Sequence, residues 1–357
     1  MIDQRFIEMP HDPEQETLVP EEGLQALLVA LLNRKGMFAA EAEIGAARMV
    51  EADLRGLHSH GSRMVRRYIE AMDQGDIDPR AQIVTLCETP AVAVLDGGRG
   101  LGHVAATRAM QLAIEKARAV GTGTVVVKNG QHLGANAVYV QLAIDAGMIG
   151  ECVTSSGKAT VAAYGSRQPA TSNHALAWGV PTRNGPPFLL DMACAESSWG
   201  KIRSLALYGQ PLPMGWALDA DGRGTTDPRQ AATLLPAAGP RGFGLGILAG
   251  VLAGALAGGK LPIHKRREYL SEPSEHFLQA IDPGRFVEPD RFFKQVDSAL
   301  ADVRALEPAS DFERVRLPGQ RQWERLNAAR EHGIPLHHEH VQKLRNLAGK
   351  MNVSVPW

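Results

Sequence analysis

The spacing of apolar residues predicts helices at both ends of the chain. Between residues 21 and 52, leucines and alanines recur at helical spacing in two successive runs. A further helix is predicted over residues 66–72. Near the other end, residues 321–351 have a polar helical pattern that is interrupted around Gly333. These patterns place helical segments on either side of a central region of different character.

The central region alternates short apolar runs, which predict strands, with longer helical patterns. Strands are predicted at 91–95, 124–127, 149–153 and 188–191, and helices at 102–120, 135–146 and 245–257. The last of these helices is rich in alanine and glycine, which suits close packing against another layer. This mixture indicates an α/β or α+β fold, in which terminal helices surround a central sheet domain.

Composition and charge narrow the class of protein. A chain of 357 residues is long enough for two or three subdomains. The formal net charge of -1, with no long run of one sign, argues against nucleic-acid and anionic-membrane partners. The most apolar stretch, residues 245–261, is marginally short for a membrane span. Because the three cysteines form no CxxC pair and the N-terminus lacks the apolar core of a secretory signal, we expect a cytoplasmic protein.

The segment from residue 53 to 67 carries the first candidate chemistry. It contains His58, Ser59 and His60 close to three arginines. Imidazole exchanges a proton near neutral pH, and guanidinium is a good partner for a carboxylate. The segment therefore suits the binding and protonation of a small anion. A helix start capped by Ser59 and followed by solvated basic residues is an equally open interpretation.

Three further segments have polar or glycine-rich sequences at the ends of predicted elements. His132 lies between glycines just after the strand at 124–127, where it can face a cleft or bond a backbone carbonyl. Hydroxyl and amide side chains at 154–157 and 171–174 suit a diphosphate or an amide, and equally suit ordinary turns. The glycine-rich segment 239–246 enters a helix, an arrangement that can present backbone N–H groups to a phosphate.

Several familiar motifs are absent or incomplete. Residues 244–249 match the pattern GxGxxA, but no strand precedes them, which argues against a normal Rossmann site. The sequence has no P-loop and no GxSxG elbow. His58 and His60 have the H-x-H spacing of some metal-dependent hydrolases, but no second metal motif accompanies them. We therefore predict no metal and keep the hydrolase as an alternative.

Short motifs are distributed in order along most of the chain. They are Ser59-His60-Gly61, Gln131-His132-Leu133-Gly134, Leu190-Asp191-Met192-Ala193, Gly200-Lys201-Ile202, Arg241-Gly242-Phe243-Gly244, Leu317-Pro318-Gly319 and Gly333-Ile334-Pro335. In order and spacing they resemble the type 2 malate/L-lactate dehydrogenase family, from about residue 22 to about residue 350. That family includes ureidoglycolate and sulfolactate dehydrogenases and Δ1-piperideine-2-carboxylate reductases. The resemblance implies an oxidoreductase that uses NAD or NADP on a small anionic 2-oxo or 2-hydroxy acid or a cyclic 2-imino acid.

The resemblance also implies an architecture. The family fold is mixed α/β and is not a Rossmann fold. It has a largely antiparallel-sheet cofactor domain, flanked by a helical domain built from both chain termini, and it works as a homodimer. On this basis residues 1–90 form an N-terminal helical and substrate part, and residues 91–315 form the central domains, with the cofactor sheet at about 130–260. Residues 316–357 form a C-terminal helical part that packs with the N-terminal part.

Site residues follow from the resemblance by position. His60 and His132 fall on the catalytic and substrate-contacting histidines, one giving a proton and the other orienting the substrate, with Ser59 in support. The family's cofactor contacts fall on Ser156, Asn173, Asp191, Met192, Ala193, Arg241, Pro318, Gly319 and Gln320.

The chain departs from the family pattern at a few positions. Met64 stands where the family has an arginine that contacts the substrate carboxylate, so we expect Arg63 or Arg66 to take over that contact. Arg241, a further candidate for substrate binding, replaces a lysine. His174 and Gln320 replace a proline and a glutamate. These departures leave open a relative that binds ligand or cofactor without efficient turnover.

Overall fold

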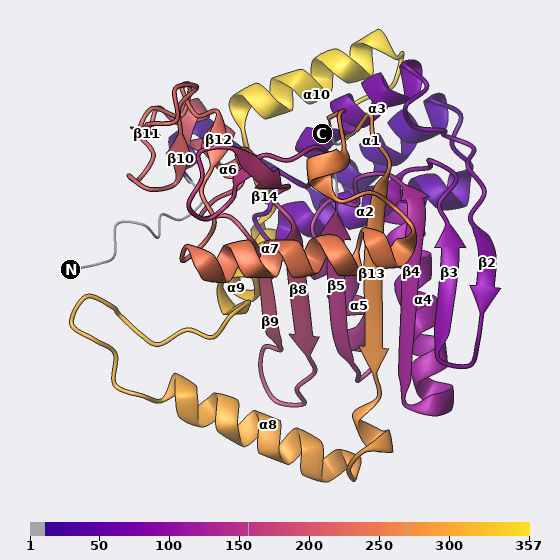
Figure 1. The fold of residues 1–357 in the computed structure, drawn as a ribbon. Helices are drawn as coiled ribbons and strands as arrows, with labels where there is room; N and C mark the ends of the chain where they lie inside the picture. The colour runs from indigo at the N-terminus through magenta and orange to yellow at the C-terminus, as the bar shows by residue number, and fades with distance from the viewer. Residues whose placement is uncertain (1–10, 156, 269) are drawn as a thin grey trace.

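A seven-stranded sheet forms the centre of the computed structural model, which describes residues 11–155, 157–268 and 270–357 (Figure 1). The strand order is β2-β3-β4-β13-β5-β8-β9. Their bounds are β2 (Val84–Glu88), β3 (Val92–Asp96), β4 (Thr122–Gly130), β5 (Ile149–Ser155), β8 (Ala175–Val180), β9 (Phe188–Ala193) and β13 (Ser274–Ile281). All neighbours run antiparallel except β3 and β4. This confirms the largely antiparallel sheet, although its strands extend beyond the range 130–260 on both sides.

Helices cover both faces of this sheet (Figure 1). On one face lie α4 (Gly102–Val120) and α5 (Ala137–Asp145), and α7 (Pro240–Leu252) crosses the other. Because both faces are covered, successive strand residues are all apolar: Val125 and Val127 pack toward α4, whereas Val126 packs with the residues of α7. This explains the uninterrupted apolar run that the sequence has at 124–127.

Helix α7 packs on the sheet through a stripe of small residues. Its buried positions are Gly242, Gly246, Ala249 and Gly250, which recur at helical spacing. Together with the turn that follows, Pro240–Ala257 is the one described stretch long and apolar enough to cross a membrane, with a mean hydropathy of 1.4. In this fold that stretch lies across the sheet, with its small residues inward (Figure 1).

The two ends of the chain form one helical unit. It contains α1 (Glu21–Arg34), α2 (Ala39–Leu54), α3 (Val65–Asp73), α9 (Gln320–His332) and α10 (His338–Lys350). The short strand β1 (Glu16–Val19) pairs antiparallel with β14 (Ile334–His337), which occupies the predicted break near Gly333. Leucines from both ends share one apolar core. The helical part formed by both termini is thereby confirmed.

A smaller sheet and a separate helix complete the fold. The sheet has the order β11-β10-β12-β6-β7, with β6 (Val161–Ala162), β7 (Pro169–Thr171), β10 (Ala217–Leu218), β11 (Gly224–Thr225) and β12 (Thr233–Leu234). Helix α6 (Trp199–Leu207) packs near it, and α8 (Pro289–Arg304) has no buried residue. Short 3-10 turns occur at η1 (Pro13–Gln15), η2 (Ser62–Met64), η3 (Ala255–Ala257), η4 (Pro262–His264) and η5 (Pro283–Arg285).

Candidate active site

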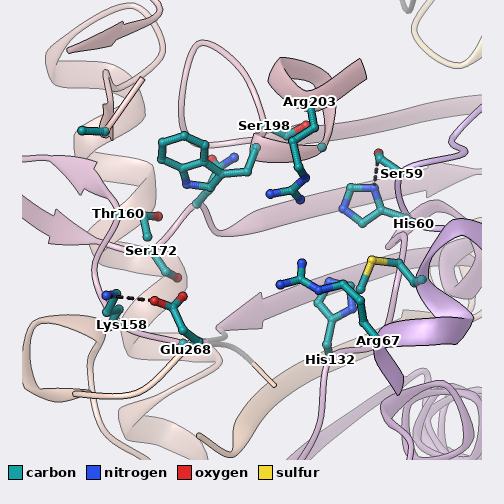
Figure 2. Close-up of a pocket in the computed structure, with 16 residues that line it drawn as sticks. Ser59, His60, Arg67, His132, Lys158, Thr160, Ser172, Ser198, Arg203 and Glu268 are labelled. Carbon is teal, nitrogen blue, oxygen red and sulfur yellow. Dashed lines mark hydrogen bonds and ion pairs between the residues drawn. The ribbon is translucent and has the colours of Figure 1, made fainter. Parts of the chain in front are cut away.

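A cavity of about 360 Å³ lies where the terminal helical unit meets α6 and the loops that follow β4, β5 and β7 (Figure 2). The residues that line one end are Ser59, His60, Met64, Arg67, His132, Gly200 and Arg203. Those at the other end include Lys158, Thr160, Ser172 and Glu268. The fold thus gathers into one hollow several segments that are distant in the sequence.

The two predicted catalytic histidines face each other in this cavity. The rings of His60 and His132 are stacked, with centroids 5.9 Å apart and an interplanar angle of 25°. Ser59 Oγ lies 2.9 Å from His60 Nδ1. The Tyr68 hydroxyl lies 2.8 Å from His132 Nδ1. The structure therefore brings together all three residues that the resemblance assigned to catalysis, and adds Tyr68.

Both histidines are neutral at pH 7. Desolvation, reinforced by the positive charge of Arg203, lowers the pKa of His60 to about 4. Desolvation also holds the pKa of His132 well below its ordinary value, and the nearby charge of His60 lowers it further. A neutral imidazole has one N–H, which donates a hydrogen bond, and one acceptor nitrogen, which can accept a hydrogen bond or a proton.

A buried carboxylate holds the loop that carries Ser59 and His60. Asp53 accepts a hydrogen bond from the backbone N–H of Ser62 (2.7 Å) and pairs with His58 Nδ1 (2.9 Å). Burial raises the pKa of Asp53, but the hydrogen bonds from His58 and Ser62 and the charges of His58 and His340 together outweigh burial, so the net pKa is lowered. A Cβ at Gly61 would lie 2.3 Å from Asp53 Oδ1, so this approach requires glycine.

The arginines of the segment 63–67 point in different directions. Met64 and Arg67 line the cavity, because positions three apart share one helical face. Arg63 instead donates to Ser204 Oγ (2.8 Å), and the exposed Arg66 donates to Glu70 (2.7 Å). The expectation that Arg63 or Arg66 replaces the missing arginine at Met64 therefore does not match the geometry, since neither lines the cavity.

A second arginine reaches the cavity from α6. Gly200, in the first turn of this helix, lies so close to Ser59 that a Cβ there would lie 2.5 Å from Ser59 Cβ. Arg203 follows three residues later on the same helical face and lines the cavity. Figure 2 shows Arg203 beside His60 and Arg67 beside His132. Sequence reasoning counted Arg67 among the three arginines of the segment 53–67 but expected Arg63 or Arg66 to bind the substrate, and it missed Arg203. The helical period of the two motifs would have indicated both Arg67 and Arg203.

The predicted cofactor residues lie in several places. Asn173 lines the cavity, and its amide is bonded to the backbone of Ala195 and Ser197. Asp191, Met192 and Ala193 lie on the edge strand β9. Desolvation raises the pKa of Asp191 to about 6, although the backbone N–H of Ala137 donates to its carboxylate. Ser156 lies outside the described residues.

Three other candidates are grouped around β9. The carbonyl of Pro318 accepts from the N–H of Leu189 (3.2 Å), and Gly319 packs against Leu189. This places the Pro318-Gly319 turn beside the strand that carries Asp191. The side chain of Gln320 does not bond β9: it accepts from the N–H of Leu317 and donates to the carboxylate of Glu324.

Arg241 is exposed in the first turn of α7. Its neighbour Gly242 lies against the carbonyl of Cys194, one residue after β9 ends. The start of α7 therefore lies at the end of β9 that carries Ala193. Arg241 is not among the residues that line the cavity.

His58 and His60 line different cavities. His58 borders a separate hollow of about 280 Å³ together with Asp53 and Arg325. Across the described ranges, no group of three or more histidine, cysteine or acidic side chains is arranged to hold a metal ion. The H-x-H spacing therefore does not place the two imidazoles on one site, contrary to the hydrolase alternative.

The side chains around the cavity suit a polar ligand larger than the substrate alone. Ser155 and Ser197 precede or adjoin lining residues, and their hydroxyls are buried without a hydrogen-bond partner among the residues that the structure describes. Buried hydroxyls of this kind are normally satisfied by a ligand or water. Ser197 lies beside Asn173, whose amide donates to the Ser197 carbonyl (2.9 Å), and Ser172, Asn173 and Ser198 line the cavity there. Hydroxyl and amide groups of this kind fit the polar groups of a nicotinamide dinucleotide.

Comparison with known proteins assigns the chain to a family. The family model described as malate/L-lactate dehydrogenase matches residues 19–345. The protein therefore belongs to the malate/L-lactate dehydrogenase family, and it is a dehydrogenase or reductase acting on CH–OH or CH–NH groups. This confirms the resemblance drawn from the sequence motifs.

Individual relatives extend over nearly the full chain. L-sulfolactate dehydrogenase of Methanocaldococcus jannaschii is 33% identical over 345 residues, covering 95% of this chain and 98% of the relative. The NAD(+)-named ureidoglycolate dehydrogenase of Escherichia coli K12 is 30% identical and covers 89% and 92%. The solved malate dehydrogenase of Pyrococcus horikoshii superposes with a TM-score of 0.89 at 28% identity, covering 98% and 100%. A relative from Pseudomonas putida, 28% identical over 340 residues, is named Δ1-pyrroline-2-carboxylate/Δ1-piperideine-2-carboxylate reductase.

Proposed function

We propose that the protein transfers a hydride between NAD or NADP and a small 2-oxo or 2-hydroxy acid, or a cyclic 2-imino acid. The observation that carries this proposal is the pair of stacked, neutral histidines beside two arginines in one cavity. Hydride transfer to or from such a substrate requires a proton at the same oxygen or nitrogen. A cationic side chain that binds the substrate carboxylate holds the reacting atom at a fixed distance from the protein.

We propose that Arg67 and Arg203 bind the substrate carboxylate and any second anionic group. Both guanidinium groups lie at the end of the cavity that holds the histidines (Figure 2). Planar guanidinium groups match carboxylates with paired hydrogen bonds. The cations also favour neutral histidines, because positive charges lower the pKa of a neighbouring imidazole.

The polar end of the cavity is the proposed location of the cofactor. The nicotinamide supplies or accepts the hydride when bound. Ser172, Asn173 and Ser198 line this end of the cavity and would hold its polar groups. The rest of the cofactor would extend along β9 toward the Pro318-Gly319 turn, which bonds that strand at Leu189. The similarity to a relative named as NAD(+)-dependent supports NAD as the cofactor. The screen described next compares NAD with NADP.

A cofactor and substrate screen tests this function. We expect reduction of NAD or NADP when the protein is mixed with 2-hydroxy acids, and oxidation of the reduced cofactor with 2-oxo or cyclic imino acids. Absorbance at the nicotinamide band measures both. Quenching of NADH or NADPH fluorescence without consumption across the whole panel would instead indicate a relative that binds without turnover.

Loss of either arginine should weaken substrate binding. We expect Arg67→Ala and Arg203→Ala each to raise KM by roughly 10- to 100-fold, the equivalent of a charge-assisted hydrogen bond of about 1.5–3 kcal/mol. The matched control is Arg66→Ala, because Arg66 bonds Glu70 away from the cavity. Steady-state kinetics with saturating cofactor measure the effect. An unchanged KM in both cavity variants would contradict the assigned role.

We further propose a homodimer in the cytoplasm, with no nucleic acid or membrane as partner. The half-exposed side chains of Ile247, Leu248 and Val251 lie on α7, and α8 has no residue buried in its own chain. A second copy would cover these apolar surfaces. Sedimentation velocity measures the assembly, and a monomer at micromolar concentration would contradict it.

The three free cysteines support the proposed cytoplasmic location, because free thiols persist in a reducing compartment.

A further inference from the structure

One acidic side chain lies at the polar end of the cavity. Among the described residues that line the cavity, Glu268 is the only acid, and its carboxylate pairs with Lys158 Nζ at 2.9 Å (Figure 2). Lys158 supplies one of the roughly four hydrogen bonds that a carboxylate can accept. The remaining acceptor sites of Glu268 suit a ligand group that donates hydrogen bonds.

The backbone around both side chains is held by several hydrogen bonds. The N–H of Lys158 donates to the carbonyl of Arg267 (3.0 Å), so the two segments lie side by side. Asp76, which is buried just beyond the end of α3, accepts from the guanidinium of Arg267 (3.0 Å) and from the Ser271 hydroxyl (2.9 Å). Residues on both sides of Glu268 are thereby attached to the helical unit.

The ion pair itself is weaker than the framework that carries it. The side chains of Lys158 and Glu268 are 47% and 66% exposed, and ion pairs at such exposure contribute little to stability. Either side chain can therefore exchange its partner for a ligand group at small cost. A fixed backbone that presents exchangeable charges lowers the entropy cost of ordering a binding site when the ligand arrives.

The chemical order of the proposed cofactor matches the order of side chains along the cavity. The nicotinamide must reach a substrate held beside the histidines, so its ribose and then the adjoining phosphate follow toward the polar end. A ribose presents two adjacent hydroxyl donors, which suit the two oxygens of a carboxylate. A phosphate suits an ammonium group, which is a compact point charge.

We propose, on the basis of the proposed function, that Glu268 and Lys158 together clamp the nicotinamide half of the cofactor. Glu268 accepts hydrogen bonds from the ribose attached to the nicotinamide, and Lys158 pairs with the phosphate attached to that ribose. The additional phosphate of NADPH is on the other ribose, so the clamp serves NADH and NADPH equally.

Fluorescence titration of the full chain with three reduced ligands tests the clamp without turnover. NADH contains the whole cofactor, reduced nicotinamide mononucleotide lacks the adenosine monophosphate half, and reduced nicotinamide riboside also lacks the remaining phosphate. We expect Lys158→Gln to raise the Kd of NADH and of the mononucleotide roughly 10-fold and to leave that of the riboside unchanged. Glu268→Gln should raise the Kd of all three ligands by roughly 3- to 10-fold.

The matched controls are Glu43→Gln and Lys350→Gln, because both side chains are exposed and neither lines the cavity. They should leave every Kd unchanged. An equal loss of mononucleotide and riboside affinity in Lys158→Gln would overturn the phosphate contact. An unchanged Kd of NADH in both cavity variants, or a different fold-change for NADPH, would overturn the clamp and leave the proposed function standing. An unmodified protein that binds neither NADH nor NADPH would overturn both.

Discussion

Replacement of His60 or His132 by alanine should each lower turnover by roughly 10²–10⁴-fold, the usual contribution of a positioned acid–base group. Alanine removes both the proton-exchanging nitrogen and the hydrogen-bond donor, and leaves space in the cavity for water. Both side chains line the cavity, and their rings are 5.9 Å apart. Single-turnover measurements with saturating cofactor separate this loss from weaker substrate binding.

The control for this prediction is His338→Ala. His338 is exposed at the start of α10 and does not line the cavity. Its loss should leave turnover unchanged, while thermal unfolding shows whether each variant is folded. Near-normal turnover in both His60→Ala and His132→Ala would remove the catalytic assignment. A loss confined to one of them would restrict it to that residue.

Acidification should destabilise the protein strongly between pH 7 and pH 5. Four histidines, His103, His174, His276 and His340, are buried, and desolvation lowers their pKa values to about 3 or 4 from an ordinary 6.5. The unfolded chain therefore binds more protons than the folded one below about pH 6.5. The stability from these groups is fully present above that pH and is lost as the pH falls.

The size of this effect follows from the linkage of protonation to folding. Each group loses a little under about 2 kcal/mol between pH 7 and pH 5, so the four together remove roughly 7 kcal/mol of unfolding free energy. The carboxyl of Asp191, with its pKa raised to about 6, acts in the opposite direction and offsets about 1 kcal/mol. Because domains are typically stable by 5–15 kcal/mol, we expect the melting temperature to fall steeply. Equal melting temperatures at pH 7 and pH 5 would contradict the neutral, buried state of these histidines.

Periodicity in the sequence predicted the long elements well. Residues 102–120 are a helix with the predicted bounds, and the break near Gly333 coincides with β14. The strand β13 and the helix α8 were missed. Every residue of β13 except Gln279 and Ile281 is buried, but its Ser, Glu and His residues lack a continuous apolar pattern. Long-range pairing with β4 and β5 makes it a strand.

Site residues that lie in a recognisable motif could be predicted from the sequence. Residues whose role depends on the direction of their side chains could not. His60 and His132 could be identified because each lies in a recognisable motif, and the structure brings both to one cavity. The arginines could not be chosen by proximity in sequence, since Arg66 and Arg67 differ by about 100° around one helix. Tyr68 was missed because its role depends on a contact with a residue 64 positions away.

The anchoring of the reactive loop by α10 has a consequence for synthesis of the protein. The loop that carries His60 is attached at Ser62 to His340 of α10 by a 2.8 Å contact between residues 278 positions apart in the sequence. On the ribosome, the loop emerges long before α10 and lacks that anchor until α10 has been made and packed. A nascent chain, or one truncated before α10, should therefore have no fully formed catalytic centre.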